Sequence, residues 1–117
     1  MHASFLDATN FPKEGEVWVA ILGKNIGSEI NGGLHNFSRP VLVVKKFSNQ
    51  IYWAVPLSTK QKSLDFYLNF TDVDGQKVAL ILAQLRLINI RRFRRKVYDI
   101  APEIFRDIRQ RLIGYLT

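Results

Sequence analysis

Two short runs of β-branched and aromatic residues, with a polar pair between them, constrain the fold more than any other feature of this sequence. The runs are residues 41–44 (VLVV) and 51–55 (IYWAV), and the polar pair is residues 48–49 (SN). Residues of this kind favour extended strands, and two strands joined by a short polar turn form a β-hairpin. The sequence therefore predicts a hairpin over residues 39–57.

The register of this hairpin brings a cation and a hydroxyl group together at its open end. If the turn is centred on the polar pair, Phe47 faces Gln50, and the same register places Arg39 opposite Ser58, with Thr59 beside it. A guanidinium is permanently charged and its forked N–H groups match phosphate oxygens, while a hydroxyl can donate to the same phosphate. An arginine before a strand is also commonly a solvated charge, and a Pro-x-Ser-Thr segment is commonly a turn. Both interpretations are open, and the first predicts a phosphodiester site.

Short strand-like segments make up most of the remaining sequence, and one helical segment ends it. The strand-like segments are residues 16–22, 64–70, 77–82, 86–90 and 97–100. From Pro102 onward, apolar residues recur at helical spacing, which predicts a helix over residues 102–116. Several short strands followed by one helix indicate a mainly β fold, a small, strongly bent antiparallel barrel with a C-terminal α-helix.

A long polar loop interrupts the first half of this pattern. Residues 23–38 contain four glycines and three asparagines between two predicted strands, and long ordered loops are often functional. His35 in this loop is a candidate acid or base because the pKa of histidine lies near neutrality, although a lone loop histidine is more often incidental. We predict one domain over residues 1–117, with residues 1–14 as a lead-in and residues 23–38 as an active-site loop.

The net charge of +7 and the isoelectric point near 10.0 indicate an anionic partner, nucleic acid first and an acidic protein second. Residues 91–96 (RRFRRK) carry five positive charges in six residues. The four arginines around Phe93 could hold a nucleic-acid backbone, and they could equally face an acidic protein or solvent. The sequence leaves these alternatives open.

The sequence lacks the patterns of the common metal and phosphate-binding sites. It has no cysteine and two histidines, and Asp72 and Asp74 beside Gly75 are explained by turn formation. Its glycines do not form a P-loop, because the lysine–hydroxyl ending is missing. We therefore expect no metal and no cofactor. The apolar runs are too short to span a membrane and residues 1–13 lack the layout of a secretion signal, so we expect a cytoplasmic protein.

Five parts of the sequence follow one another in the order found in a known toxin family. They are residues 15–18 (GEVW), 25–32 (NIGSEING), 39–44 (RPVLVV), 55–60 (VPLSTK), and 81–88 (ILAQLRLI) with 92–93 (RF). Together they resemble the MazF/PemK (Kid) toxins of type II toxin–antitoxin systems, over about residues 14–113.

The resemblance implies a fold, an activity and partners. The fold is an SH3-like barrel that forms a homodimer. The activity is that of a metal-independent endoribonuclease, an mRNA interferase, which cleaves single-stranded RNA by attack of the 2′-hydroxyl group. A cognate antitoxin neutralises the enzyme, and contact with DNA is only indirect, through an antitoxin complex.

The resemblance also assigns roles to residues. Arg39 matches the catalytic arginine of the family, and Ser58, followed by Thr59, falls where the family usually has a catalytic threonine. Gln84 and Arg86 match a Gln-x-Arg segment near the dimer and substrate surface. The candidates for proton transfer are His35 and Glu29, and the candidates for contacts with RNA are Asn25, Lys60, Gln84, Arg86 and Arg92.

Three departures from the family pattern are present. The loop between Asn31 and Arg39 is longer than the common form, Ser58 replaces a threonine, and Ala83 stands where some members carry an acidic residue. Two other functions stay open. A non-catalytic module would use the same barrel to bind nucleic acid or an acidic protein, and a toxin directed at DNA gyrase would use the same scaffold.

Overall fold

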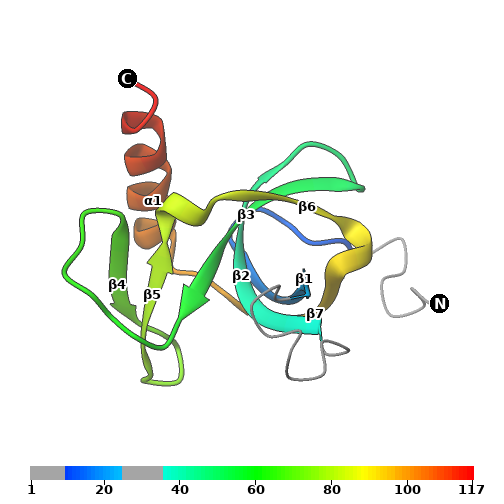
Figure 1. Cartoon of the computed structure of the whole chain (residues 1–117), viewed down its shortest axis with the longest axis horizontal. Coiled ribbons are helices and arrows are strands. Elements are labelled where there is room, and N and C mark those ends of the chain that lie inside the picture. The colour runs from blue at the N-terminus through cyan, green and yellow to red at the C-terminus, as the bar shows by residue number, and fades with distance from the viewer. Residues whose placement is uncertain (1–9, 25–35) are drawn as a thin grey trace.

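Strands account for most of the described chain, and a single α-helix follows them (Figure 1). The computed structural model describes residues 10–24 and 36–117. Its elements are β1 (Glu16–Lys24), β2 (Asn36–Lys46), β3 (Ile51–Ser58), β4 (Tyr67–Thr71), β5 (Lys77–Ile81), the 3-10 turn η3 (Leu82–Gln84), β6 (Arg86–Asn89), the 3-10 turn η4 (Ile90–Arg92), β7 (Phe93–Asp99) and α1 (Pro102–Gly114). The predicted mainly β fold with a C-terminal helix is confirmed. Within these residues, no helix has the length and apolar character needed to cross a membrane.

The strands form an antiparallel sheet in which β3 changes partner along its length. The strand order is β4-β5-β3-β2-β1-β7, and β6 pairs with β3 outside this path. Residues 51–54 of β3 pair with β6, whereas Leu57 and Ser58 at its end pair with β5. Figure 1 shows α1 beside β4 and β5 at one end of the molecule, with β1 and β7 toward the other end. The end of β3 therefore lies where two parts of the sheet meet.

The β2–β3 hairpin has the predicted register at its open end but not at its turn. Val41 pairs with Pro56 and Leu42 with Val55, as the sequence predicted. The prediction that Phe47 faces Gln50 is wrong, because the Phe47 N–H donates to the Ile51 carbonyl at 3.0 Å. The turn is one residue longer than expected, and a register shift between Val43 and Lys45 on β2 absorbs the extra residue. The two deviations cancel, so the open end keeps its expected alignment.

Most element boundaries differ from their predictions by one to four residues. β1 continues through Lys24 and β2 begins at Asn36, so strand residues occupy the described ends of the predicted 23–38 loop. The predicted strand 64–70 is β4 at 67–71, and the strands expected at 77–82 and 86–90 end at residues 81 and 89. The predicted helix 102–116 ends at Gly114, after which the Leu116 N–H donates to the Ile113 carbonyl.

The last strand differs most from its prediction. It was expected at 97–100, but β7 begins at Phe93, inside the basic segment 91–96. Phe93 is fully buried, while the basic residues that follow it are exposed. The buried Phe93 within this charged segment therefore determines where β7 starts.

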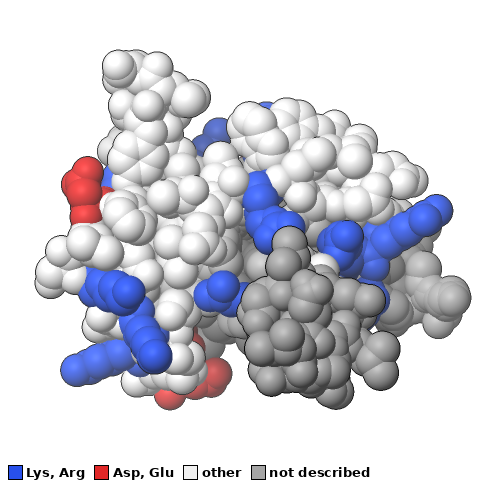
Figure 2. Space-filling view, viewed as in Figure 1, with Lys and Arg blue, Asp and Glu red and all other residues white. Residues whose placement is uncertain are grey.

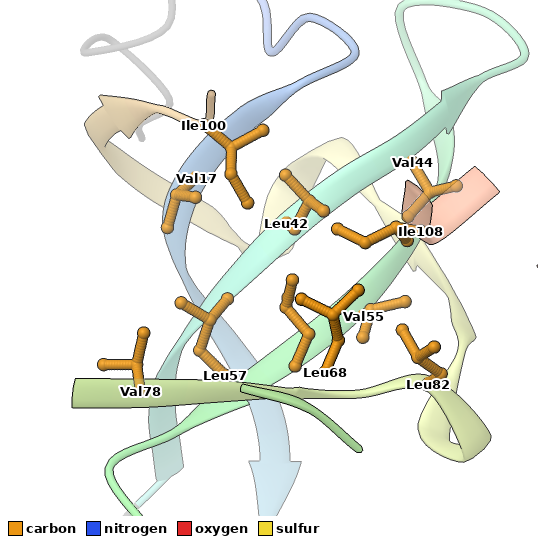
Figure 3. Packing of buried hydrophobic residues seen from close by; sticks show 11 residues of the cluster. Val17, Leu42, Val44, Val55, Leu57, Leu68, Val78, Leu82, Ile100 and Ile108 are labelled. Carbon is orange, nitrogen blue, oxygen red and sulfur yellow. The ribbon is translucent and has the colours of Figure 1, made fainter. Parts of the chain in front are cut away.

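Two apolar clusters pack on the central strands because alternate strand residues point to opposite faces. Leu42 belongs to the first cluster, together with Val55 and with Ile108 of α1 (Figure 3). Val41 and Val43, on either side of Leu42, belong to the second. The members of the second cluster are Trp18, Ala20, Val41, Val43, Tyr52, Ala54, Ile88 and Phe93. Both faces of β2 are thus buried over residues 41–43, which fixes the strand just after Arg39.

Glu16, the one buried charged residue of the described chain, links β1 to β7. Its Oε1 accepts hydrogen bonds from Trp18 Nε1 and from the Lys13 N–H, both at 2.9 Å, and its Oε2 lies 3.2 Å from Lys96 Nζ. Glu16→Ala leaves three donors without this acceptor, so we expect a loss of about 3 kcal/mol in the free energy of unfolding. Urea denaturation measures the loss.

The matched control is Glu103→Ala, which removes an exposed carboxylate from the first turn of α1. This change should cost under about 1 kcal/mol, the usual effect of a charge at a helix end. Equal losses for the two variants would show that the buried contacts of Glu16 contribute little.

Candidate active site

Arg39 is held at the start of β2 by strands on both sides. It pairs with Ala20 of β1, and its Nη2 donates a hydrogen bond of 2.9 Å to the Leu57 carbonyl at the end of β3. This bond uses one of the five N–H groups of the half-buried guanidinium. Arg39 is therefore an oriented side chain fixed to the end of the neighbouring strand.

Ser58 ends β3, where it pairs with Ala79 of β5. Its Oγ accepts a hydrogen bond from the Lys60 N–H at 3.0 Å, so the hydroxyl closes a turn, as the structural interpretation of the sequence expected. Ser58 and Thr59 also line the same pocket as Arg39, which has a volume of about 370 Å³. The two interpretations of Ser58 are thus compatible, since an oxygen that accepts a bond can still donate its own hydrogen.

The pocket contains further residues, for which the sequence suggested no such role. Its lining is Arg39, Pro40, Leu57, Ser58, Thr59, Asp72, Asp74, Gln76, Val78, Val97 and Tyr98. Asp72 does cap the β4–β5 turn, because its Oδ1 accepts from the backbone N–H groups of Asp74 and Gln76, both at 2.9 Å. Turn formation therefore accounts for Asp72, as the sequence predicted, but it does not account for the place of the two aspartates in the pocket lining. No local signal marks the aspartates or Tyr98, because β5–β3 and β7–β1 pairing brings them to the pocket.

Tyr98 contributes a phenol hydroxyl group to this pocket. Burial raises its pKa to about 12, and the negative charges of Asp72 and Asp74 add to the effect. The phenol therefore stays protonated at neutral pH and can donate a hydrogen bond. The pocket combines a cation, several hydroxyl groups and two carboxylates from different elements.

The predicted RNA-contact residues that the structure describes do not line this pocket. Arg86 and Arg92 converge on the end of β1, where Arg86 Nη2 lies 3.5 Å from the Leu22 carbonyl and Arg92 Nη1 lies 3.4 Å from the Ile21 carbonyl. Gln84 is exposed in η3, and Lys60 is exposed just after β3. Three further predicted site residues, Asn25, Glu29 and His35, lie outside the described residues.

Three arginines of the basic segment 91–96 line a second pocket, which has a volume of about 450 Å³. The pocket is lined by Ile21, Gln50, Asn89, Arg91, Arg92 and Arg94. Figure 2 shows basic side chains, and no acidic ones, on the part of this face where Figure 1 places η4. The segment is an arginine-rich surface, suited to binding an anion.

An apolar groove of about 650 Å³ runs between the β2–β3 hairpin and α1. The exposed rings of Phe47 and Trp53 line it and contact each other edge to face at 4.9 Å. From α1 and the turn after it, Ile113 and Leu116 contribute exposed side chains, Leu116 being 87% exposed. Apolar surface of this extent is typical of a contact face for another protein chain.

Solved structures of MazF toxins are similar to this fold. MazF from Deinococcus radiodurans has a TM-score of 0.73 at 17% identity, with 91% of this chain and 96% of that chain covered. A MazE–MazF complex from the same organism has a TM-score of 0.69 at 17% identity, covering 91% and 95% of the two chains. An endoribonuclease in complex with its cognate antitoxin, from a mycobacterial species, has a TM-score of 0.69 at 16% identity, covering 90% and 94%. These similarities show that the chain has the MazF-like fold.

The family follows from the sequence. The model of the PemK-like, MazF-like toxin of type II toxin–antitoxin system matches residues 13–116, nearly the whole chain. No curated protein matches the chain. The chain belongs to the PemK-like, MazF-like toxin family, which confirms the resemblance seen in its motifs.

Proposed function

We propose that this protein is a toxin that cleaves single-stranded RNA, chiefly mRNA, by attack of the 2′-hydroxyl group of the substrate on the neighbouring phosphate. The observation that carries the proposal is the pocket that joins Arg39 of β2 to Ser58, at the end of β3, and to Thr59, just after it. RNA supplies its own nucleophile, so the enzyme has to orient it and stabilise the charge that develops on the phosphate. Family membership supports a toxin activity for this site.

Arg39 would stabilise the phosphorane. Its bond to the Leu57 carbonyl fixes the guanidinium plane, and its other N–H groups would bind the non-bridging oxygens. Ser58 or Thr59 would donate to the same phosphate and hold it for in-line attack. These groups supply charge and orientation, so the mechanism requires no metal ion and no cofactor.

The RNA chain on either side of the cleaved bond would lie on the polar surface around the pocket. Arg86 and Arg92, which meet at the end of β1, would bind its phosphates, and Lys60 and Gln84 would extend the contact. From the sequence alone, Asn25 is a further contact residue, and Glu29 and His35 are the loop candidates for proton transfer. Recognition of a particular RNA sequence would depend on these surrounding contacts.

The proposed partners are a cognate antitoxin and a second copy of this chain. Two of the similar solved structures are complexes of a toxin with its antitoxin, and an antitoxin with acidic segments would suit the charge of +7. The apolar groove with Phe47, Trp53 and Ile113 is a candidate homodimer face. The cytoplasm, where mRNA is found, is the proposed site of action.

Removal of metal ions tests the chemistry directly. A long single-stranded RNA incubated with the protein in excess EDTA should be cleaved as fast as without EDTA, because no proposed group depends on a metal. Every product pair should carry a 2′,3′-cyclic phosphate and a 5′-hydroxyl, identified by mass spectrometry of the ends.

Two results would contradict the proposal. Loss of cleavage in EDTA would place a metal in the mechanism. Salt-sensitive RNA binding without any cleavage would instead favour a non-catalytic binding module, the alternative that the arginine-rich surface supports.

A further inference from the structure

The proposed reaction needs a group that accepts the proton of the 2′-hydroxyl. Arg39 is permanently charged, the hydroxyls of Ser58 and Thr59 are poor bases, and Tyr98 stays protonated at neutral pH because its pKa is about 12. The remaining charged groups among the described lining residues are the carboxylates of Asp72 and Asp74. A carboxylate is a suitable general base once it is ionised.

The β4–β5 turn uses its two aspartates differently. Asp72 fixes the turn, because its Oδ1 accepts from two backbone N–H groups and its carbonyl accepts from the Gly75 N–H at 3.0 Å. Gly75 has a φ of +81°, a conformation that glycine adopts without strain. The turn's hydrogen bonds involve Asp74 only through its backbone N–H. The exposed Asp74 carboxylate is therefore presented by a turn that Asp72 holds.

The cation and the carboxylates of the pocket come from different elements, β2 and the β4–β5 turn. No ion pair joins Arg39 to either aspartate, although the structure describes all three residues. Both aspartates act electrostatically on Tyr98 of β7, which lines the same pocket. A pocket of about 370 Å³ has room for a phosphate near the guanidinium and its ribose near the carboxylates.

We propose that Asp74 is the general base of the RNA cleavage proposed above and that Asp72 is a positioning residue that holds the turn for it. The inference rests on that proposed function. The Asp74 carboxylate takes the proton of the 2′-hydroxyl as the 2′-oxygen forms a bond to phosphorus. The bond from phosphorus to the 5′-oxygen breaks, and the 5′-oxygen takes a proton from solvent. The products are the cyclic phosphate and the 5′-hydroxyl, and Asp74 then releases its proton to solvent.

The pH dependence of cleavage by Asp74→Asn tests this role. The dependence of kcat/KM on pH is measured on one RNA of known cleavage site. The wild type should lose activity toward acid pH as the base becomes protonated. Asp74→Asn should cleave about 10²- to 10³-fold more slowly at neutral pH and should lack this acidic limb. Asp74→Glu should retain the limb at a lower rate, because it keeps a carboxylate in a shifted position.

The Asp72 variants separate positioning from catalysis. Asp72→Asn keeps an Oδ1 acceptor for the turn and should retain the acidic limb. Asp72→Ala removes the acceptor and should lower the rate with the limb still present. Glu103→Gln, which neutralises an exposed carboxylate of α1 that lines neither this pocket nor the apolar groove, is the control and should match the wild type.

A second readout is independent of activity. In Asp74→Asn, Tyr98 loses one of the charges that raise its pKa, so its titration, resolved from that of the other tyrosines by NMR, should move to lower pH. Unchanged titration of Tyr98 would contradict the placement of Asp74 in the pocket. The same titration shows whether the variant is folded.

The outcomes of these measurements distinguish the two proposals. A wild type that does not cleave RNA contradicts the proposed function and the base together. If the wild type cleaves, the role of Asp74 alone is overturned by an Asp74→Asn variant with an unchanged rate and limb. It is also overturned if Asp72→Asn, Glu29→Gln or His35→Gln removes the limb instead, or if Asp74→Asn changes only the cleaved sequence.

Discussion

Arg39→Ala is expected to lower the rate of RNA cleavage at least about 10³-fold without unfolding the protein. The guanidinium is the cation of the pocket, and its bond to the Leu57 carbonyl fixes its direction before substrate arrives. An alanine leaves the charge of the phosphorane without this partner. Initial rates on a long RNA in EDTA measure the loss, and circular dichroism checks the fold.

Two further variants sharpen this test. Arg39→Lys keeps the charge but loses the forked donors, so it should recover only a small part of the rate. Arg106→Ala removes an exposed arginine of α1 that does not line the pocket, and it should cleave as the wild type does. An Arg39→Ala protein that cuts at the normal rate would contradict the assignment of Arg39.

Phe93→Ala is expected to lower the free energy of unfolding by about 3–5 kcal/mol, a large part of the stability of a small domain. Phe93 is fully buried in the second apolar cluster. Its ring meets Trp18 at 5.9 Å and Tyr52 at 5.1 Å between ring centroids, both edge to face. The substitution would leave a cavity between β1, β3 and β7, and urea denaturation gives the size of the loss.

Phe47→Ala is the matched control, since it removes the same side chain from an exposed position. The Phe47 ring is 51% exposed and contacts Trp53, so its removal should cost about 1 kcal/mol. The experiments should use low protein concentration, because Phe47 lies in the candidate dimer groove. If both variants lost the same stability, the Phe93 cluster would not be the anchor of β7.

The sequence predicted the kinds of elements well and their ends less well. Alternation and β-branched residues are local properties, so the hairpin and the helix after Pro102 could be found from them. The start of β7 could not be found in this way. Phe93 stands among five charged residues, and its burial depends on Trp18 and Tyr52 from distant strands. Packing against distant residues decides such a boundary.

The pocket around Arg39 was likewise predicted from local patterns only in part. Arg39 and Ser58 belong to one hairpin, so the register of that hairpin is enough to place them together. Asp74 and Tyr98 come from the β4–β5 turn and from β7, which reach the pocket only through β5–β3 and β7–β1 pairing. No pattern in a single segment records such long-range pairing. The sequence therefore predicted the part of the pocket that lies within one hairpin.

The register shift between Val43 and Lys45 lies between the turn of the β2–β3 hairpin and its open end. A turn that gains or loses a residue ordinarily moves every pair behind it and turns each side chain to the opposite face. Here the shift absorbs the extra residue of the turn, so the open end keeps its alignment from the Val41–Pro56 pair to the bond between Arg39 and the Leu57 carbonyl. The tip can therefore diverge among relatives, or accept an engineered insertion with a matching deletion at the shift, while the pocket keeps its geometry.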